Sequence, residues 1–294
     1  MSAPMHGVAI DAGSGLAAAL HEARGPLADE GDLFRFKQAV VTALAPQATT
    51  VLVDAALGPR LLAGFPPGCA PMMAYEADVY RIDSAERITV LPDNLRIADL
   101  PGMGVGHLKF FMWYAPDDDP ALNRRKQALV ARIGAACRAH GLRFLMEPLV
   151  YHPELAPGTP AFARAKPDLV CRAVAVFAQP RFGASVLKVE VPADLGHATE
   201  DAALQAFVEV GAAAGAVPIV FLSAGVPFVE FERALQLAHR SGAGFAGFMC
   251  GRALWSDAIP VYGSGGAAAA RDWLMSEGRA RLARLKAAME GRDV

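Results

Sequence analysis

The feature that most constrains the fold is the alternation of short apolar runs with longer amphipathic stretches along the chain. Eight runs are rich in β-branched, aromatic or other apolar residues, and they cover residues 7–11, 50–54, 71–76, 108–114, 143–150, 186–191, 218–223 and 247–251. Such runs are typical of parallel strands that are buried on both faces. The connecting stretches would then supply the helices that cover the sheet.

Several connecting stretches show the spacing of an amphipathic helix. Apolar residues between 33 and 44 recur at intervals of three and four behind Asp32, which we expect to be the N-cap. The same spacing occurs at 122–137 and 231–238, and a glycine follows each stripe. Eight strand–helix units in 294 residues predict one domain, a (β/α)8 TIM barrel over residues 1–294. An open doubly wound sheet is the alternative.

Charge and composition exclude several classes of partner. The formal net charge is −2 at pH 7, so the chain has no surplus of Lys and Arg for nucleic acid or anionic lipid. It has no basic leader and no stretch of the ~20 apolar residues that a bilayer requires, so we expect a cytoplasmic protein. The four cysteines and seven histidines are scattered without metal-ligand spacing. We therefore expect no disulfide, metal or other cofactor.

Charged residues interrupt three of the predicted strands. Lys109 lies in the fourth, Glu147 in the fifth, and Lys188 and Glu190 in the sixth, where their spacing of two places them on one face. A charge inside a core strand needs a partner or a chemical role, because burying it alone is costly. One interpretation is a purely structural network of ion pairs.

The other interpretation is a Schiff-base lysine. An amine attacks a carbonyl only when it is neutral, and a nearby cation together with burial lowers a lysine pKa from about 10.4. Two lysines and a carboxylate on consecutive strands suit this chemistry. One amine would attack, the other would lower its pKa, and the carboxylate would move protons.

Two further loops favour an anion site. Ser223, Ala224 and Gly225 follow the seventh predicted strand, and Gly251 and Arg252 follow the eighth. In this fold these two loops often bind phosphate, through backbone N–H groups and a bidentate arginine. Structural turns with a surface arginine are the alternative. An imine-forming lysine opposite an anion pocket predicts a phosphorylated or otherwise anionic sugar as substrate.

Two glycine-rich segments have simpler explanations. Residues 11–15 (DAGSG) follow the first strand but lack the full spacing of a dinucleotide-binding turn. Residues 263–266 (GSGG) could hold an anion at a helix start, but we expect a plain loop before the C-terminal helix.

The sequence resembles the tagatose 1,6-bisphosphate aldolase family, a group of class I barrel aldolases that is also similar to sulfofructose 1-phosphate aldolases. The resemblance runs in order from about residue 8 to residue 255. It is carried by LKFFMWYAPDD (108–118), FLMEPL (144–149), KPDLVCRAVAVFAQPRFGASVLKVEVP (166–192), FLSAGV (221–226) and FMCGRALW (248–255), with AYE (74–76) and LPDNL (91–95) also fitting.

The resemblance implies roles for individual residues. Lys188 would be the Schiff-base lysine, and Glu147 would be the acid/base that handles the substrate hydroxyl proton. Lys109 would assist Glu147, and Asp11 corresponds to an aspartate that ends the first strand in the family. The phosphate of the fragment held as the imine would be bound by Ser223, Gly225, Gly251 and Arg252.

The chain departs from the family beside Asp11. Members usually continue that aspartate with Gln and Arg, whereas Ala12 and Gly13 follow it here. The implied function is cleavage of a phosphorylated ketose, such as tagatose 1,6-bisphosphate or a related sulfonated or deoxy sugar phosphate, to dihydroxyacetone phosphate and an aldehyde. A barrel that binds a sugar phosphate as a sensor or regulator without turnover is the alternative. A homo-oligomer is compatible with either function.

Overall fold

A closed barrel of eight parallel strands forms the centre of the molecule. In the computed structural model, which describes residues 4–78 and 86–292, each strand pairs with its neighbours in sequence and β8 pairs with β1. This confirms the barrel, and the doubly wound alternative is wrong. The strands are β1 (Met5–Ile10), β2 (Thr50–Val53), β3 (Ala70–Ala74), β4 (His107–Tyr114), β5 (Arg143–Val150), β6 (Val186–Glu190), β7 (Ile219–Leu222) and β8 (Gly247–Cys250).

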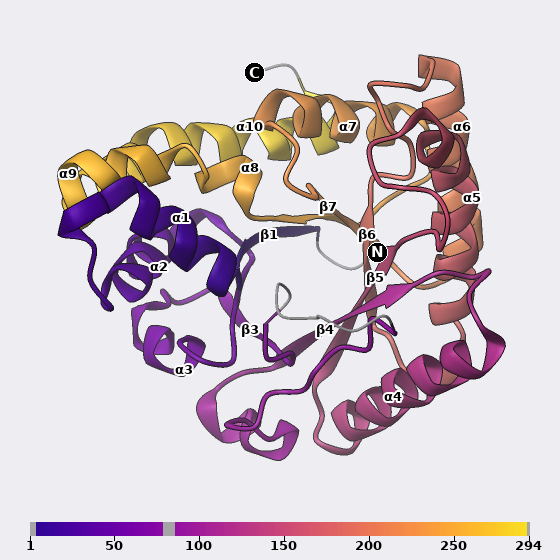
Figure 1. Ribbon diagram of the computed structural model, residues 1–294, viewed down its shortest axis with the longest axis horizontal. Coiled ribbons are helices and arrows are strands. Elements are labelled where there is room, and N and C mark those ends of the chain that lie inside the picture. Colours follow the sequence, from indigo (N-terminus) through magenta and orange to yellow (C-terminus); the bar gives the residue numbers. More distant parts are fainter. Residues whose placement is uncertain (1–3, 79–85, 293–294) are drawn as a thin grey trace.

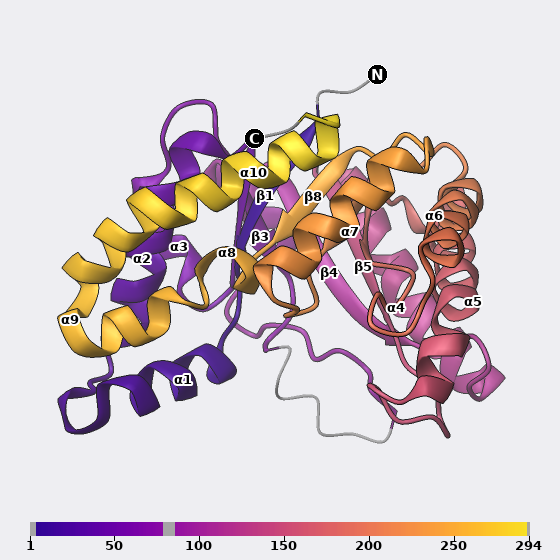
Figure 2. The same ribbon diagram turned by 90° about the horizontal axis from the view of Figure 1, so that it is seen from above.

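Helices surround the barrel and cover the outer faces of its strands (Figure 1). Figure 2, turned by 90°, shows α10 running beside α7 along one side of the molecule. Among the described residues, no helix is long and apolar enough to cross a membrane. The helices are α1 (Ser14–Arg24), α2 (Asp32–Leu44), α3 (Gly58–Leu61), α4 (Pro120–Ala139), α5 (Pro160–Phe177), α6 (Glu200–Ala214), α7 (Phe228–Arg240), α8 (Arg252–Trp255), α9 (Ala258–Trp273) and α10 (Arg279–Glu290).

The barrel interior is filled by apolar side chains beneath the rim where the strands end. Because all strands run parallel, their carboxyl ends meet at that single rim. The inner cluster consists of small and medium side chains from most strands, which are Ala9, Leu52, Met72, Ala74, Leu145, Val186, Val220 and Met249. The barrel is therefore plugged with apolar side chains below its carboxyl rim.

Two local expectations are wrong. Asp32 is the first residue of α2 and Gly31 is the N-cap. The Asp32 carboxylate accepts a hydrogen bond from the backbone N–H of Asp29, which precedes the helix, instead of from a backbone N–H of the helix itself. Residues 263–266 are not a loop before a helix but lie within α9, which kinks at Gly266, where φ is +68°. Alanines after the glycines favour a helix, and only glycine adopts this φ readily.

Candidate active site

Three charged side chains lie in one layer of the barrel, directly above its apolar plug. Lys109 comes from β4, Glu147 from β5 and Lys188 from β6. Leu145 and Val186 belong to the inner apolar cluster. Glu147 lies two residues after Leu145, and Lys188 lies two residues after Val186. Because side chains two apart in a strand share a face, the charges also point inward.

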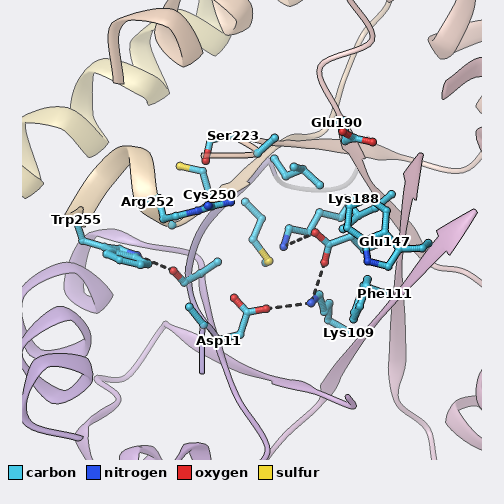
Figure 3. Close-up of a pocket in the computed structure, with 18 residues that line it drawn as sticks. Asp11, Lys109, Phe111, Glu147, Lys188, Glu190, Ser223, Cys250, Arg252 and Trp255 are labelled. Atoms are coloured by element: carbon cyan, nitrogen blue, oxygen red, sulfur yellow. Dashed lines mark hydrogen bonds and ion pairs between the residues drawn. The ribbon is translucent and has the colours of Figure 1, made fainter. Parts of the chain in front are cut away.

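Glu147 lies between the two lysines (Figure 3). Its Oε1 is 3.0 Å from Nζ of Lys188, and its Oε2 is 2.9 Å from Nζ of Lys109. All three side chains are buried, with 5% of Glu147, 5% of Lys188 and 1% of Lys109 exposed. The predicted acid/base and both predicted lysines thus lie buried in one pocket.

Lys109 is surrounded by carboxylates. Its Nζ also pairs with Asp11 Oδ2 at 3.0 Å and with Glu76 Oε1. Burial by itself would lower the pKa of Lys109, but the three carboxylates around the ammonium outweigh burial and raise that pKa well above its ordinary value. Of the two lysines, Lys109 is therefore unsuited to act as a nucleophile near neutral pH. Whether its charge lowers the pKa of Lys188 stays a prediction.

Asp11 and Glu76 are the two other carboxylates that contact Lys109, and their pKa values are shifted in opposite directions. Burial opposes ionisation of Asp11, but the ammonium groups of Lys109 and Lys188 overcome it and hold the Asp11 pKa well below its usual range. Burial raises the pKa of Glu76 to about 7 despite the attraction of Lys109. Of these two carboxylates, Glu76 is the one with a pKa near neutral pH.

Glu190 does not join this network, although it shares a face with Lys188. Its Oε2 accepts a hydrogen bond of 2.8 Å from the backbone N–H of Val150, and its Oε1 lies 4.0 Å from Nζ of Lys166. Burial raises the pKa of Glu190, and Lys166 counteracts this only in part. Glu190 is thus a rim carboxylate rather than a fourth member of the cluster.

The loops after β7 and β8 close the other side of the pocket. Gly225 has φ of +86°, and a Cβ built on it would lie 2.6 Å from Cζ of Arg252, so the guanidinium lies against the bare backbone. Ala224 also has a positive φ, of +50°, and Ser223 is buried. A strained turn beneath an exposed arginine is suited to bring backbone N–H groups and a guanidinium onto one anion.

The charged layer and the two loops line one cavity of about 330 Å³. Trp255 borders it, and its Nε1–H donates a 2.8 Å hydrogen bond to the carbonyl of Ala9, which ties the loop after β8 to β1. The lining residues used below are Asp11, Ala12, Lys109, Glu147, Lys188, Glu190, Ser223, Ala224, Gly251 and Arg252. Gly225 lies beside this cavity, in contact with Arg252.

Sequence reasoning placed Asp11, Lys109, Glu147 and Lys188 in the pocket but did not include Glu76. Glu76 follows β3 and is the last residue of the predicted run 71–76, so it does not interrupt an apolar run as Lys109 and Glu147 do. Within residues 4–78 and 86–292, no group of three or more His, Cys, Asp or Glu side chains could hold a metal ion.

The sequence is similar to those of known aldolases. The model of the DeoC/LacD family aldolases matches residues 6–257. The tagatose 1,6-diphosphate aldolase of Listeria monocytogenes serotype 4a is 31% identical over 289 residues, with 95% of this chain and 85% of that protein covered. The enzyme of the same name from Staphylococcus aureus strain JH9 is 35% identical over 258 residues, with 83% and 78% covered.

A solved structure has the same fold. It is an archaeal fructose-1,6-bisphosphate aldolase with its catalytic lysine bound to the carbinolamine intermediate of its substrate. The TM-score is 0.61 at 12% identity, over 95% of this chain and 92% of that one.

The fold and these relatives define the class of protein as a carbon–carbon lyase of the Schiff-base aldolase type. Within that class, the chain belongs to the DeoC/LacD aldolase family.

Proposed function

We propose that this protein is a class I aldolase that cleaves a ketose 1-phosphate to dihydroxyacetone phosphate and an aldehyde, with Lys188 as the Schiff-base lysine. The observation that carries the proposal is the contact of 3.0 Å between Lys188 Nζ and Glu147 Oε1 inside the barrel. A buried amine beside a carboxylate can lose its proton to that carboxylate and then attack a carbonyl.

Imine formation is the first half of the reaction. The neutral amine of Lys188 attacks the C2 carbonyl carbon, and the carbinolamine then loses water to leave a protonated imine. Glu147 takes protons from the attacking nitrogen and returns one to the departing hydroxyl. Lys109 keeps its charge throughout, because Asp11, Glu76 and Glu147 hold its pKa high.

Carbon–carbon cleavage is the second half. Glu147 removes the proton of the C4 hydroxyl, the C3–C4 bond breaks, and its electron pair moves into the iminium to give an enamine. The aldehyde leaves with C4 as its carbonyl carbon. Protonation of the enamine at C3 and hydrolysis of the imine release dihydroxyacetone phosphate and restore Lys188.

The 1-phosphate would be held by the loops after β7 and β8. Arg252 lines the cavity and is exposed, and it makes no ion pair with any residue that the structure describes. Its guanidinium is therefore available to a phosphate, together with the backbone around Ser223, Ala224, Gly225 and Gly251. This anchoring orients C2 toward Lys188 and C4 toward Glu147.

The relatives support a ketose phosphate as substrate. Two are named tagatose 1,6-diphosphate aldolase, and the archaeal neighbour acts on fructose 1,6-bisphosphate. Tagatose 1,6-bisphosphate and a sulfonated ketose phosphate are the candidates that the sequence resemblance supplies. The proposal takes the whole chain as one catalytic domain, free to form a homo-oligomer.

Borohydride reduction tests the proposal. The protein is incubated separately with fructose 1-phosphate, tagatose 1,6-bisphosphate, fructose 1,6-bisphosphate and sulfofructose 1-phosphate, reduced, and digested for mass spectrometry. We expect a reduced triose phosphate adduct on Lys188 with at least one sugar, and aldehyde release that is insensitive to a chelator. Lys188→Met should lose the adduct and reduce kcat by at least about 10³-fold.

A second lysine variant, Lys286→Met, controls for the general effect of replacing a lysine by methionine. Lys286 lies in α10 and hydrogen bonds to the carbonyl of Gln47, so Lys286→Met should keep both the adduct and the turnover. Retained cleavage in Lys188→Met would refute the assignment. Binding of every sugar without adduct or cleavage would favour a non-catalytic sugar-phosphate sensor.

A further inference from the structure

One wall of the active-site cavity is aromatic. Phe111 and Trp113 of β4 both line the cavity, and we call this pair of side chains the aromatic wall. They follow Lys109 at intervals of two, so all three side chains point into the barrel. The two rings meet edge to face, with 6.5 Å between their centroids and an interplanar angle of 88°. No step of the proposed reaction uses this wall.

The aromatic wall begins beside Glu147 and extends toward the rim of the barrel. Phe111 pairs in register with Glu147, and Trp113 pairs with Leu149, which lies nearer the carboxyl end of β5. Phe111 is fully buried, whereas Trp113 is partly exposed. Trp113 is therefore the member of the wall that a molecule in the cavity can cover.

Trp113 has an unused hydrogen-bond donor. Its Nε1–H makes no hydrogen bond with the residues that the structure describes, and it does not belong to their buried polar atoms that lack a partner. The Nε1–H therefore reaches accessible space. Trp255 also lines the cavity, but its Nε1–H is bound to the carbonyl of Ala9. Because a covered tryptophan N–H usually has a partner, a ligand that covers Trp113 should offer an oxygen acceptor.

The order of the strands around the barrel places the aromatic wall at the distal end of the proposed substrate. The loops after β7 and β8 would hold the 1-phosphate, Lys188 of β6 would hold C2, and Glu147 of β5 would act at the C4 hydroxyl. The next strand in this direction is β4, which carries Trp113 and lies opposite β8 in the closed ring. In Figure 3, Arg252 lies on one side of the cavity and Glu147 and Phe111 lie on the other.

We infer that Trp113 binds the distal fragment of the ketose, which leaves as the aldehyde, and thereby contributes to substrate specificity. The indole ring packs against the carbons beyond C4, and its Nε1–H donates a hydrogen bond to an oxygen of that fragment. A hydroxyl and a phosphate both supply such an oxygen, so the contact suits a ketose 1,6-bisphosphate. The inference rests on the proposed function, since it takes Lys188 as the position of C2.

Inert analogues of different length test the inference without turnover. Glucitol 1,6-bisphosphate spans the whole substrate, whereas glycerol 1-phosphate lacks the distal fragment, and neither has a carbonyl that could form an imine. Calorimetry measures their affinities for the full chain. We expect Trp113→Leu to weaken binding of the long analogue at least about tenfold and to change binding of the short one less than about twofold.

Two results of this measurement would overturn the inference. One is unchanged binding of the long analogue in Trp113→Leu, or no binding of that analogue to the wild type. The other is an equal loss for both analogues, which a general distortion of the cavity would produce. Trp273→Leu is the matched control, because Trp273 ends α9 and does not line the cavity, so both affinities of the folded variant should stay near wild type.

The condensation reaction tests the hydrogen bond by itself. Trp113→Phe keeps an aromatic ring and removes the N–H donor. We expect KM for the aldehyde to rise about two- to tenfold, with dihydroxyacetone phosphate trapped on Lys188 by borohydride at the wild-type rate. A larger rise for glyceraldehyde 3-phosphate than for glyceraldehyde would identify the distal phosphate as the acceptor, and equal rises would identify a hydroxyl. Slower trapping with an unchanged aldehyde KM would contradict the inference.

Failure of the inference is distinguishable from failure of the proposed function. If borohydride labels Lys188 but the Trp113 variants bind the long analogue as the wild type does, the aldolase stands and the inference falls. If Trp113→Leu weakens only the long analogue but no sugar phosphate is trapped or cleaved, Trp113 stands as a binding residue and the catalytic proposal falls.

Discussion

Glu147 Oε1 lies 3.0 Å from Nζ of Lys188, on the adjacent strand of the barrel. The same carboxylate contacts Lys109 through its other oxygen, at 2.9 Å. One carboxylate therefore faces a fixed cation on one side and the proposed nucleophile on the other. This arrangement places Glu147 within hydrogen-bond reach of both amines, so it is positioned to accept any proton that Lys188 gives up.

Glu147→Gln should slow turnover without preventing the imine. The amide keeps the shape of the side chain but cannot accept a proton, so we expect kcat to fall by about 10²–10⁴-fold. Borohydride should still trap substrate on Lys188, but more slowly than in wild type, because imine formation also loses its proton acceptor. Steady-state kinetics and mass spectrometry measure the two effects. Glu190→Gln, on the same face as Lys188 but hydrogen bonded to Val150, should have the smaller effect. A larger loss in Glu190→Gln would reverse the assignment.

Glu76→Gln should change how stability depends on pH. The ordinary glutamate pKa is 4.5, and burial raises that of folded Glu76 to about 7. A raised folded pKa contributes stability that is complete below pH 4.5 and is lost as the pH rises through about 7. Because glutamine resembles the protonated acid, the unfolding free energy of the variant minus that of wild type should increase by roughly 3 kcal/mol from pH 4.5 to pH 8.

Urea unfolding at a series of pH values measures this difference. Glu209→Gln, on the exposed face of α6, serves as the control and should give no comparable trend. A difference for Glu76→Gln that stays flat or falls with rising pH would contradict the assignment of a raised Glu76 pKa.

Much of the fold could be predicted, because strands buried on both faces appear in the sequence as apolar runs and the covering helices as apolar residues spaced by three and four. The fifth strand, residues 143–150, has the bounds that its apolar run predicts. Strand ends are less certain, since β1 begins at Met5 and ends at Ile10, one or two residues from expectation. The predicted N-cap, Asp32, was wrong by one position, because its carboxylate accepts a hydrogen bond from the backbone N–H of Asp29 before the helix. An aspartate at the start of a helix suits either position, so the residue type alone does not distinguish them.

The site could be predicted only in part. Lys109, Glu147 and Lys188 are visible as charges within apolar runs. Glu76 gives no such signal, and its contact with Lys109 joins residues 33 positions apart. Catalytic roles for these residues remain predictions from resemblance and chemistry.

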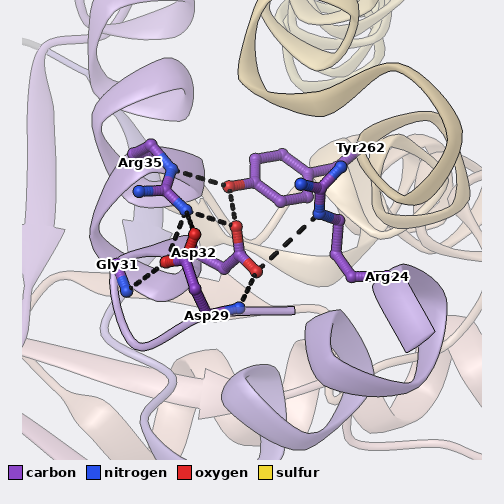
Figure 4. Close-up of polar contacts among 6 residues, drawn as sticks. All are labelled: Arg24, Asp29, Gly31, Asp32, Arg35 and Tyr262. Carbon is purple, nitrogen blue, oxygen red and sulfur yellow. Dashed lines mark hydrogen bonds and ion pairs between the residues drawn. The ribbon is translucent and has the colours of Figure 1, made fainter. Parts of the chain in front are cut away.

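Tyr262→Phe should destabilise the protein by removing a polar contact between α9 and α2. Figure 4 shows the Tyr262 hydroxyl of α9 between Arg35 and Asp32 of α2. The hydroxyl donates to Asp32 Oδ1 at 2.7 Å and accepts from Arg35 Nε at 3.3 Å. Its removal takes a donor from a buried carboxylate, so we expect a loss of about 1–3 kcal/mol in the free energy of unfolding.

Denaturant unfolding measures that loss, and Tyr75→Phe is the matched control. The hydroxyl of Tyr75 makes no hydrogen bond with the described residues, so its removal should change stability by less than about 0.5 kcal/mol. Equal effects of the two substitutions would show that the contacts of Tyr262 contribute nothing. Turnover per folded molecule should be unchanged in Tyr262→Phe, because the cluster lies outside the active-site cavity.

Gly225→Ala should weaken binding of the 1-phosphate. Gly225 has φ of +86° and Gly68 has φ of +88°, so alanine at either position incurs a similar backbone penalty of about 1 kcal/mol. Only at Gly225 does the new Cβ meet another group, Cζ of Arg252 at 2.6 Å, whereas nothing lies within 4 Å at Gly68. The clash displaces the guanidinium from its place against the backbone.

Comparison of the two variants isolates the role of that contact. We expect KM for a ketose 1-phosphate to rise about tenfold in Gly225→Ala and to stay near the wild-type value in Gly68→Ala, with similar losses of stability. Inorganic phosphate should also inhibit Gly225→Ala less than Gly68→Ala, because phosphate would occupy the same anion site without the sugar. If both variants keep the wild-type KM and phosphate inhibition, the 1-phosphate is not held by the Gly225–Arg252 contact.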